Sequence, residues 1–304
     1  FGVDAKDGVK IGKYAWGFFP SVAAAWVISN EPWYRLKGID FLKLNVGFDM
    51  LGNDDVNSQV SRTYFVAGKM FNSISGKTLG NIGNTKLQWE TTSRLTAGIQ
   101  LAAVKNRVQF GFNYFRSTTS NLLSLNALSY LTGMNTNWTN GGKLSNEGFD
   151  ANFNLRLIAT KDWTWSLGAS IGHYKNKIKE LPNNSKSFTT ELYGGTIISQ
   201  VGQPAGMFYG YKTDGVYANS AAAESDGLAI QDLAGNKTYF GAGDIRFVDQ
   251  NNDKVINDAD RVVIGDPNPD IYGNIRANFY IGKHWNLGIH FNYSLGNDIY
   301  NYQR

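Results

Sequence analysis

The chain has 304 residues, and its 29 Lys and Arg against 25 Asp and Glu give a mild formal net charge of +4 without a basic run, so nucleic acid is not an expected partner. The absence of Cys excludes a disulfide scaffold, a thiolate zinc site and a cysteine nucleophile. The longest apolar run covers residues 22–28, far short of the roughly 20 residues of a membrane helix, and the first residues do not resemble a secretory signal.

The residue types favour strands and loops over helices. Only six Glu are present, whereas the chain has 34 Gly, 8 Trp, 16 Tyr and 18 Phe, together with many Asn, Ser and Thr. Most of these residues are weak helix formers, and the aromatic ones are typical of strands. We therefore expect an all-β protein.

Eight segments alternate apolar and polar residues with a period of two, which predicts strands with one apolar and one polar face. In the second segment, for example, Leu42, Leu44 and Val46 alternate with Lys43 and Asn45. The lengths are close to the ~9–11 residues with which a tilted strand crosses a bilayer. In chain order the segments cover residues 16–28, 42–48, 95–101, 108–114, 149–157, 163–171, 275–281 and 285–295.

The polar face of the predicted strands differs from that of a sheet in water. A soluble sheet commonly exposes Lys, Glu and Thr, but the polar positions here hold mainly Gly, Asn, Ser and Gln. Small and amide side chains suit the wall of a wide, water-filled lumen. Arg94, Arg156 and Arg276 lie on this face and are expected to line the path through it.

The connections between the strands alternate strictly between short and long. Tight junctions at 102–107, 160–162 and 282–284 separate long excursions at 50–87, 118–145 and 174–270. An outer-membrane barrel has this pattern, with short periplasmic turns and long extracellular loops. The sequence therefore predicts part of a large transmembrane antiparallel β-barrel, and the whole of 174–270 is expected to be one extracellular loop region.

The placement of the Trp residues agrees with a barrel. Trp163 and Trp285 each begin a strand directly after a tight turn, and Trp26 lies near the end of the first strand. These residues are expected to form an aromatic girdle at the periplasmic interface. Ordinary core packing of the same residues remains the alternative.

The clearest local motif is the acidic stretch 249–260, whose sequence is DQNNDKVINDAD. Oxygen donors fall at positions 1, 3, 5, 9 and 12, and a backbone carbonyl is available at position 7, which is the spacing of an EF-hand-type calcium loop. The predicted ligands of a Ca²⁺ ion are Asp249, Asn251, Asp253, Val255, Asn257 and Asp260.

The motif departs from a typical calcium loop at two positions. Position 6 is Lys254 instead of Gly, which makes the sharp turn harder, and position 12 is Asp260, whose arm is shorter than that of Glu. A turn rich in Asp and Asn without a metal is the alternative.

A second loop feature is the aromatic segment around Phe208, Tyr209 and Tyr211, which is expected to contact a substrate or a partner protein. Packing of the same rings on neighbouring strands is the alternative. The three His residues are dispersed and no nucleophile motif is present, so the sequence gives no support for an enzyme.

Several motifs, taken in order, resemble those of the SusC/RagA-type TonB-dependent outer-membrane transporters. The similarity covers nearly the whole chain. It is carried by the stretches 19–26, 42–44, 51–53, 87–92, 146–150, 202–215, 243–249, 260–261, 264–270 and 296–301.

The resemblance implies a barrel of about 22 strands with a plugged lumen. The 304 residues supply eight of these strands, so we expect the chain to be a fragment, or the ordered part, of a longer protein. A plug, a TonB-contacting segment and further strands are expected to precede Phe1, and several strands to follow Arg304.

The resemblance also implies a function, which is import of glycans, oligosaccharides or peptides across the bacterial outer membrane. The expected partners are a SusD-like surface lipoprotein, TonB and outer-membrane lipid. Two alternatives stay open at this point. One is an outer-membrane barrel with a structural or assembly role, and the other is a soluble calcium-dependent β-sandwich binding module.

Overall fold

The structure is a computed structural model that describes residues 2–4, 17–56, 58–70, 74–128, 130–134, 136–282 and 284–301. The chain divides into two compact units. The first comprises Phe1–Lys186, Gln200–Gln203 and Pro269–Gly296, and the second comprises Ser187–Ser199, Pro204–Asn268 and Asn297–Arg304. Each unit is described by itself.

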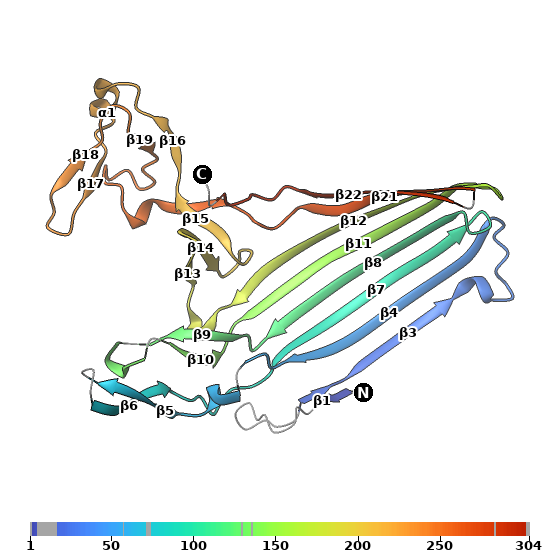
Figure 1. Ribbon diagram of the computed structural model, residues 1–304, viewed down its shortest axis with the longest axis horizontal. Coiled ribbons are helices and arrows are strands. Elements are labelled where there is room, and N and C mark those ends of the chain that lie inside the picture. Colours follow the sequence, from blue (N-terminus) through green and yellow to red (C-terminus); the bar gives the residue numbers. More distant parts are fainter. Residues whose placement is uncertain are drawn as a thin grey trace. The chain divides into compact units, whose positions relative to one another are not determined.

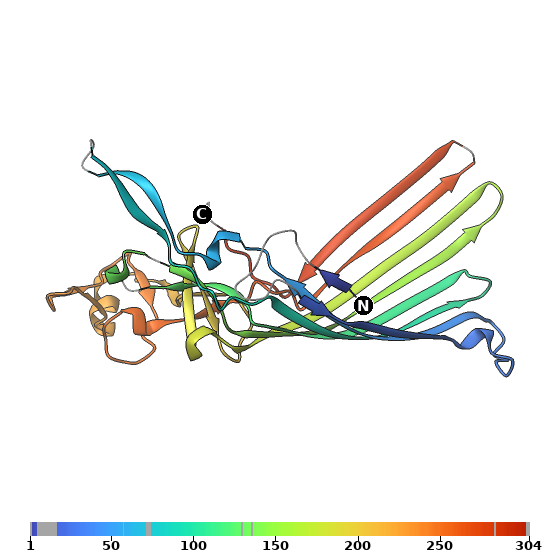
Figure 2. The ribbon, with the colours of Figure 1, turned by 90° about the horizontal axis from the view of Figure 1, so that it is seen from below.

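The first unit is built on one antiparallel sheet of eight strands in the order β22-β21-β12-β11-β8-β7-β4-β3 (Figures 1 and 2). Each strand pairs with neighbours that run in the opposite direction. The strands are β3 (Ser21–Val27), β4 (Ile39–Asn53), β7 (Glu90–Ala103), β8 (Val108–Ser120), β11 (Lys143–Ala159), β12 (Trp163–Glu180), β21 (Ile271–Ile281) and β22 (Trp285–Leu295).

All eight strands expected from the alternation occur in this sheet, and most are longer than expected. The first expected segment begins at Trp16, which lies outside the described residues, and its remainder forms the short β2 (Gly17–Phe19) followed by β3. The strand β12, in contrast, extends beyond its expected end at residue 171 and continues to Glu180. The expected loop region 174–270 is therefore corrected at its first residues, because Tyr174–Glu180 is paired strand.

The register places apolar side chains in continuous rows on one face of the sheet. Val46 lies opposite Ala24 on one side and Ala97 on the other, and Ile275 lies opposite Ala169 and Phe291. Many of these side chains stay open to the surroundings, with Phe291 61% exposed. An apolar face of this extent is costly in water.

The ends of the sheet differ in their connections. At one end, β7 and β8 are joined by residues 104–107, and β11 and β12 by residues 160–162. The turn after β7 holds Val104, Lys105 and Asn106 in the left-handed region, with φ of 54°, 56° and 59°. The N–H of Asn106 donates to the Asp40 carboxylate at 2.9 Å, which ties this costly turn to the start of β4.

At the other end, the long connections carry small structures of their own. Val60 and Leu87 form a buried cluster there with Val56, Leu123 and Trp138 packed against it. The elements of these connections are the hairpin β5 (Tyr64–Met70) and β6 (Ile74–Asn81), the hairpin β9 (Leu123–Ala127) and β10 (Thr136–Asn140), and short 3₁₀ helices at Ser58–Ser61, Tyr130–Thr132 and Pro182–Asn184. The strand β1 (Gly2–Asp4) pairs with β2, and both precede β3. A further 3₁₀ helix, Ile28–Asn30, follows β3 at the short-connection end.

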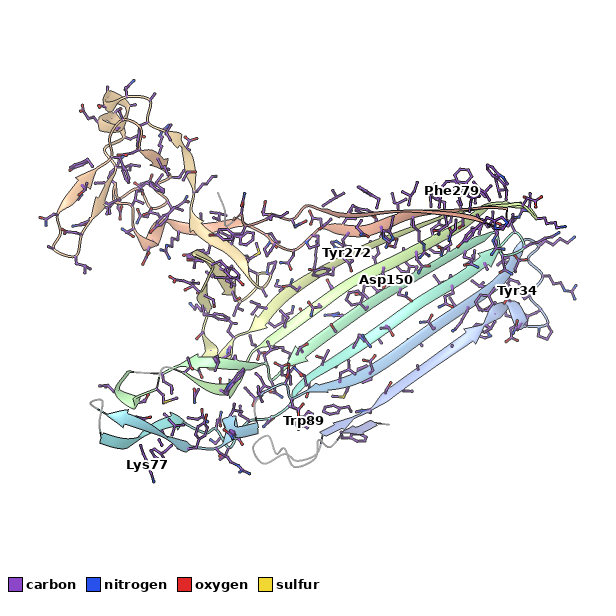
Figure 3. The ribbon with its side chains drawn as sticks, viewed as in Figure 1. Tyr34, Lys77, Trp89, Asp150, Tyr272 and Phe279 are labelled. Atoms are coloured by element: carbon purple, nitrogen blue, oxygen red, sulfur yellow. The ribbon has the colours of Figure 1, made fainter. Side chains whose placement is uncertain are left out.

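The Trp residues expected in a girdle lie on the apolar face at the end with short connections. Trp26, Trp163 and Trp285 are all exposed there, and the indole of Trp26 donates to Glu31 at 2.8 Å. Trp165 stacks on Phe279, with ring centroids 5.4 Å apart; Figure 3 labels Phe279. An apolar ring with one polar atom is suited to an interface between lipid and water.

The second unit consists of short strands and one helix. Its core contains Tyr217, Ala223, Leu228 and Ala229. A sheet is formed by β13 (Ser187–Leu192), β14 (Gly195–Gln200), β15 (Met207–Tyr211) and β20 (Arg261–Gly265); β16 (Thr213–Val216) pairs with β19 (Ile245–Phe247), β17 (Ala229–Gln231) pairs with β18 (Lys237–Tyr239), and a helix α1 (Ser220–Asp226) and a 3₁₀ helix Asp258–Asp260 complete the unit.

Helix α1 has a signal at each end that explains its short length. The side chain of Asn219 accepts a hydrogen bond from the N–H of Ala222, and Gly227 closes the helix with φ of 65°. Among the described helices, none is long and apolar enough to cross a membrane.

Candidate functional site

The polar face of the eight-stranded sheet is a continuous surface of amides and glycines. In one row, Asn45 lies opposite Gly98, which lies opposite Asn113, and Asn113 lies opposite Asp150. A second row holds Gln100, Gly111, Asn152, Ser170, Asn274 and Asn292. The sequence predicted the residue types of this face, and the register decides which of them meet.

The glycines give the amide side chains room to lie against the sheet. A Cβ atom on Gly111 would lie 2.7 Å from Nδ2 of Asn152, and one on Gly98 would overlap Oδ1 of Asn113. Both distances are shorter than real contacts allow. Because these atoms are the ends of flexible side chains, a larger residue at either glycine would displace the amides from the sheet instead of pushing the strands apart.

Hydrogen bonds link the polar side chains across strands that are distant in sequence. Asn113 Nδ2 donates to Asp150 Oδ2 at 2.9 Å, and Arg276 Nη2 donates to Asn154 Oδ1 at 2.8 Å. Arg94 Nε lies 3.2 Å from Asp49 Oδ1. Arg94 and Asp49 thus form an ion pair, whereas Asp150 and Arg276 are held by neutral amides and keep their charges.

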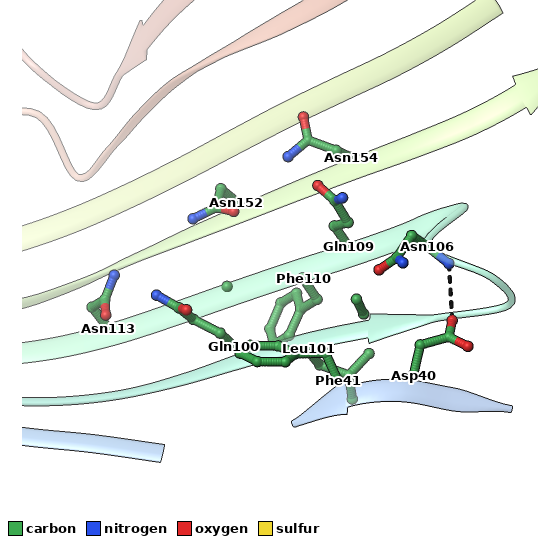
Figure 4. Close-up of a pocket in the computed structure, with 12 residues that line it drawn as sticks. Asp40, Phe41, Gln100, Leu101, Asn106, Gln109, Phe110, Asn113, Asn152 and Asn154 are labelled. Carbon is green, nitrogen blue, oxygen red and sulfur yellow. Dashed lines mark hydrogen bonds between the residues drawn. The ribbon is translucent and has the colours of Figure 1, made fainter. Parts of the chain in front are cut away.

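Two depressions lie on this face. The first has a volume of about 490 Å³ and is shown in Figure 4. Its polar lining is mostly amide, from Gln100, Asn106, Gln109, Asn113, Asn152 and Asn154, with Asp40 at one end. Each amide offers both donors and an acceptor, so this surface can bind hydroxyls or peptide groups.

The second depression, of about 630 Å³, adds charge and aromatic area to the amides. It is lined by residues that include Arg94, Asp150 and Tyr174. Tyr174 meets Tyr272 edge-to-face, with ring centroids 5.9 Å apart; Figure 3 labels Tyr272. Such rings can stack on sugars or on other flat groups.

The expected path residues Arg94, Arg156 and Arg276 all lie on this face, but they do not form one cluster. Arg156 lies opposite Ser166, near the end with short connections. The sequence analysis did not single out Tyr174 and Tyr272, because they lie just outside the predicted strands 163–171 and 275–281. Continuing the period of two by two steps beyond Ser170 reaches Tyr174, and by one step before Asn274 reaches Tyr272.

The acidic stretch 249–260 folds into a series of tight turns held by its own side chains. The carboxylate of Asp249 accepts hydrogen bonds from the N–H groups of Asn252 and Lys254, at 2.7 and 2.9 Å. The N–H of Val255 donates to Asp253 at 2.7 Å, and that of Asp253 donates to Asn251 at 3.0 Å. The side chains predicted as ligands at the start of the motif thus lie in one compact loop.

The two unusual positions of the motif have structural partners. Lys254 adopts a φ of 62° in the left-handed region, where Gly would be unstrained, and its Nζ donates to the carbonyl of Asp226 at 2.9 Å. Asp260 is fully buried, and its carboxylate accepts from the N–H groups of Gln250 and Asn257, each at 2.9 Å.

Electrostatics keep the first acid of the loop ionised. Burial raises the pKa of Asp249, but the N–H groups of Lys254 and Asn252, with smaller contributions from Asp253 and Asn251, outweigh it and hold this pKa below its ordinary value. The ionised carboxylate is the form that binds a cation.

The donor set has the chemistry that Ca²⁺ prefers, since all predicted ligands are oxygens. A carboxylate oxygen that accepts one N–H keeps a lone pair for a cation. In the described part of the chain, however, no three His, Cys, Asp or Glu side chains converge on one point. A cation here would therefore depend on Asn oxygens and backbone carbonyls as well as on carboxylates.

The aromatic segment lies in β15 and is partly engaged within the second unit. The ring centroids of Phe208 and Tyr300 are 6.3 Å apart, and those of Tyr211 and Phe247 are 5.7 Å apart. The guanidinium of Arg261 lies 5.3 Å from the centroid of the Tyr211 ring. Tyr209 lies opposite Thr196 on β14. Packing within the unit accounts for these contacts of Phe208 and Tyr211.

An apolar outer face, an amide-rich inner face and loops sorted by end define the wall of a transmembrane barrel. Residues 1–302 match the family described as TonB dependent receptor-like, beta-barrel. The chain belongs to this family.

Individual relatives agree with the assignment. TonB-dependent receptor P3 of Formosa agariphila is 31% identical over 96% of this chain and 29% of its own length. TonB-dependent receptor SusC of Bacteroides thetaiotaomicron is 24% identical over 94% of the chain and 28% of its own length. The chain thus spans less than a third of the curated relatives that it matches.

Solved structures show the same fold. A structure of the RagAB peptide importer in the closed-closed state aligns with a TM-score of 0.76 and 19% identity, covering 95% of this chain and 30% of that chain. A second structure, of the RagAB peptide transporter, aligns with a TM-score of 0.72 and 20% identity, covering 93% of this chain and 30% of that chain.

These findings confirm the SusC/RagA-type resemblance and the barrel fold, and the eight strands are part of a large transmembrane barrel wall. The alternative of a soluble β-sandwich is wrong. In the described residues of the first unit, the apolar face of the sheet carries exposed side chains instead of a second packed sheet.

Proposed function

We propose that the full-length protein is an outer-membrane importer driven by TonB, and that the polar face of the sheet lines the path of its solute. The observation that carries the proposal is the in-register division of one sheet into an apolar and an amide-rich face. The family and the similarity to SusC and to the RagAB peptide importer support it.

The chemistry of the inner face fits the proposed cargo, which is a glycan, an oligosaccharide or a peptide. Hydroxyls and peptide groups each combine donors and acceptors, as the amides of this face do. By analogy with the family, a SusD-like surface lipoprotein is the proposed partner at the extracellular side. No catalytic step is part of the proposal.

The test is uptake by cells that carry the full-length receptor. Labelled oligosaccharides and peptides are offered to cells with the receptor, without it, and with the receptor but without TonB. Import that requires both proteins supports the proposal. Uptake that is unchanged without TonB contradicts it, and a loss of envelope integrity without any transport defect favours the structural role instead.

We further propose that the loop 249–260 binds Ca²⁺ and that the ion stiffens the surface that meets the cargo or the lipoprotein. The oxygen-only donor set and the ionised Asp249 support this. Chelation of Ca²⁺ should increase proteolytic cleavage within the loop and weaken lipoprotein binding. Unchanged cleavage and unchanged binding after chelation would show that the loop is a metal-free turn.

A further inference from the structure

The apolar face ends in a defined row towards the long connections. In that row Tyr114, Phe149 and His173 lie directly opposite one another on β8, β11 and β12. The ring centroids of Phe149 and His173 are 5.8 Å apart. Below this row the outer face of the three strands is apolar, as described above.

One step beyond this row, the same face becomes charged. Two residues further along the strands, Arg116 and Lys175 lie on either side of Glu147, directly opposite it. Side chains alternate between faces with a period of two, so this charged row shares the face of the apolar row, at a distance of about 6–7 Å along the strands.

The basic character continues along β12. Lys175, Lys177 and Lys179 are exposed, whereas Ile178 between them is 5% exposed. Lys177 lies opposite Ser145, which lies opposite Thr118 on β8. Arg116, Lys175, Lys177 and Lys179, the last of which falls at a register shift between β11 and β12, are named here the outer basic cluster.

The carboxylates near this cluster only partly neutralise it. They are Glu147 and, one row beyond Ser145, Glu180, which lies opposite Lys143. Arg116 Nε lies 4.0 Å from Glu147 Oε2 with the two side chains 63% and 57% exposed. Among the described residues, no ion pair engages Lys175, Lys177 or Lys179. Three or more cations thus remain free to bind an anion.

We propose that the outer basic cluster binds the phosphate groups of lipids in the outer leaflet of the membrane. A barrel wall presents its apolar rows to acyl chains, and the first polar row above them lies at the depth of the headgroups. Lys and Arg bind phosphate, Arg through a forked pair of N–H groups, and a hydroxyl such as that of Thr118 adds a donor.

The position of the cluster favours a lipid over free phosphate. An ion from solution has no need of the apolar row directly below, whereas a phosphorylated lipid contacts the apolar row and the cations together. The inference depends on the outer-membrane placement of the barrel but not on the cargo or on TonB.

The test compares binding of lipid A carrying two phosphates with binding of its dephosphorylated form. The full-length protein in mild detergent micelles is examined by native mass spectrometry. The wild type should retain the phosphorylated form. The triple variant Lys175→Gln, Lys177→Gln, Lys179→Gln should bind it at least about tenfold more weakly, because each cation contributes to the attraction.

A matched variant removes three exposed Lys at the opposite end of the sheet, namely Lys37→Gln, Lys105→Gln and Lys161→Gln. It should bind the phosphorylated lipid as the wild type does. Unchanged heat-modifiable migration in gels shows that both triple variants are folded.

Three results would overturn the inference. These are equal binding by the first triple variant and the wild type, equal binding of the two lipid forms, and complete displacement of the lipid by millimolar inorganic phosphate. The last result would identify a site for free phosphate. Fractionation of cells is a separate measurement, and recovery of the protein outside the outer membrane would refute the proposed function itself.

Discussion

At the residue scale, glycines decide how closely neighbouring strands approach. A Cβ atom on Gly148 of β11 would overlap the carbonyl oxygen of His173 and lie 2.9 Å from Cα of Tyr174 on β12. Both are backbone atoms, which cannot rotate away as a side chain can. A larger residue therefore has to push the two strands apart.

Gly148→Ala should destabilise the full-length barrel by about 1–3 kcal/mol, the usual cost of overpacking. Thermal unfolding in detergent measures the effect. Gly288→Ala is the matched control, because its Cβ would lie 3.4 Å from Oδ1 of Asn278, in ordinary contact. An equal melting temperature for Gly148→Ala and the wild type would show that the strands separate there without cost.

The order of the acidic loop should depend on pH through Asp249. Its pKa is lowered in the folded loop because hydrogen bonds from the N–H groups of Lys254 and Asn252 outweigh the effect of burial. A lowered pKa stabilises the folded form at every pH above the pKa of the unfolded chain, which is near 3.9 for Asp. This stabilisation is lost as the pH falls through the pKa of the folded form.

Protection of residues 249–260 from hydrogen exchange should therefore persist from pH 7 to about 4 and fall only below that value. Asp249→Asn removes the titrating group and should flatten the profile, whereas Asp244→Asn, outside the loop, should leave it unchanged. Protection that already falls at pH 6 would mean that another group holds the loop.

At the element scale, the face of each strand is fixed by pairing. On β11, Ala151 belongs to the apolar face and Asn152 to the polar face, and their partners on β8 are Phe112 and Gly111. A shift in register by one residue would exchange the faces. The alternation of polarity along the strand therefore specifies the register strongly.

Labelling of introduced Cys residues can distinguish the two faces by their access to water, because these 304 residues contain no Cys. In the full-length protein, with any other Cys replaced, Asn152→Cys should react with a water-soluble maleimide and Ala151→Cys should not. The pair Asn113→Cys and Phe112→Cys should behave in the same way on β8. Equal reactivity of neighbouring positions would contradict the assignment of lipid and lumen faces.

At the scale of the whole molecule, the long connections are sorted to one end of the sheet. They hold the hairpins β5–β6 and β9–β10 and, between β12 and β21, the second unit. In a barrel of this family that end faces the outside of the cell. It is therefore the part of the chain that we propose contacts an extracellular partner.

The intact protein, extracted from the outer membrane in mild detergent, should therefore co-purify with a surface lipoprotein. Mass spectrometry of the purified complex identifies both chains. A variant that lacks the second-unit segment 204–268 should no longer co-purify with the lipoprotein, although its barrel remains in the membrane. Recovery of the barrel alone from wild-type cells, under conditions that preserve related complexes, would contradict this partnership.

The sequence by itself determined the eight strands, their two faces and the family. These properties depend on local patterns, because a period of two along each segment is independent of where that segment pairs. The residues of the calcium-type loop were also visible, since their spacing is a property of twelve consecutive positions.

Only the tertiary structure decided which residues meet across strands. The contacts Arg276–Asn154 and Asn113–Asp150 join positions far apart in the chain, and the outer basic cluster needs β8, β11 and β12 in one register. The physical reason is that cross-strand neighbours are set by hydrogen-bonded pairing between distant segments, about which the local alternation carries no information.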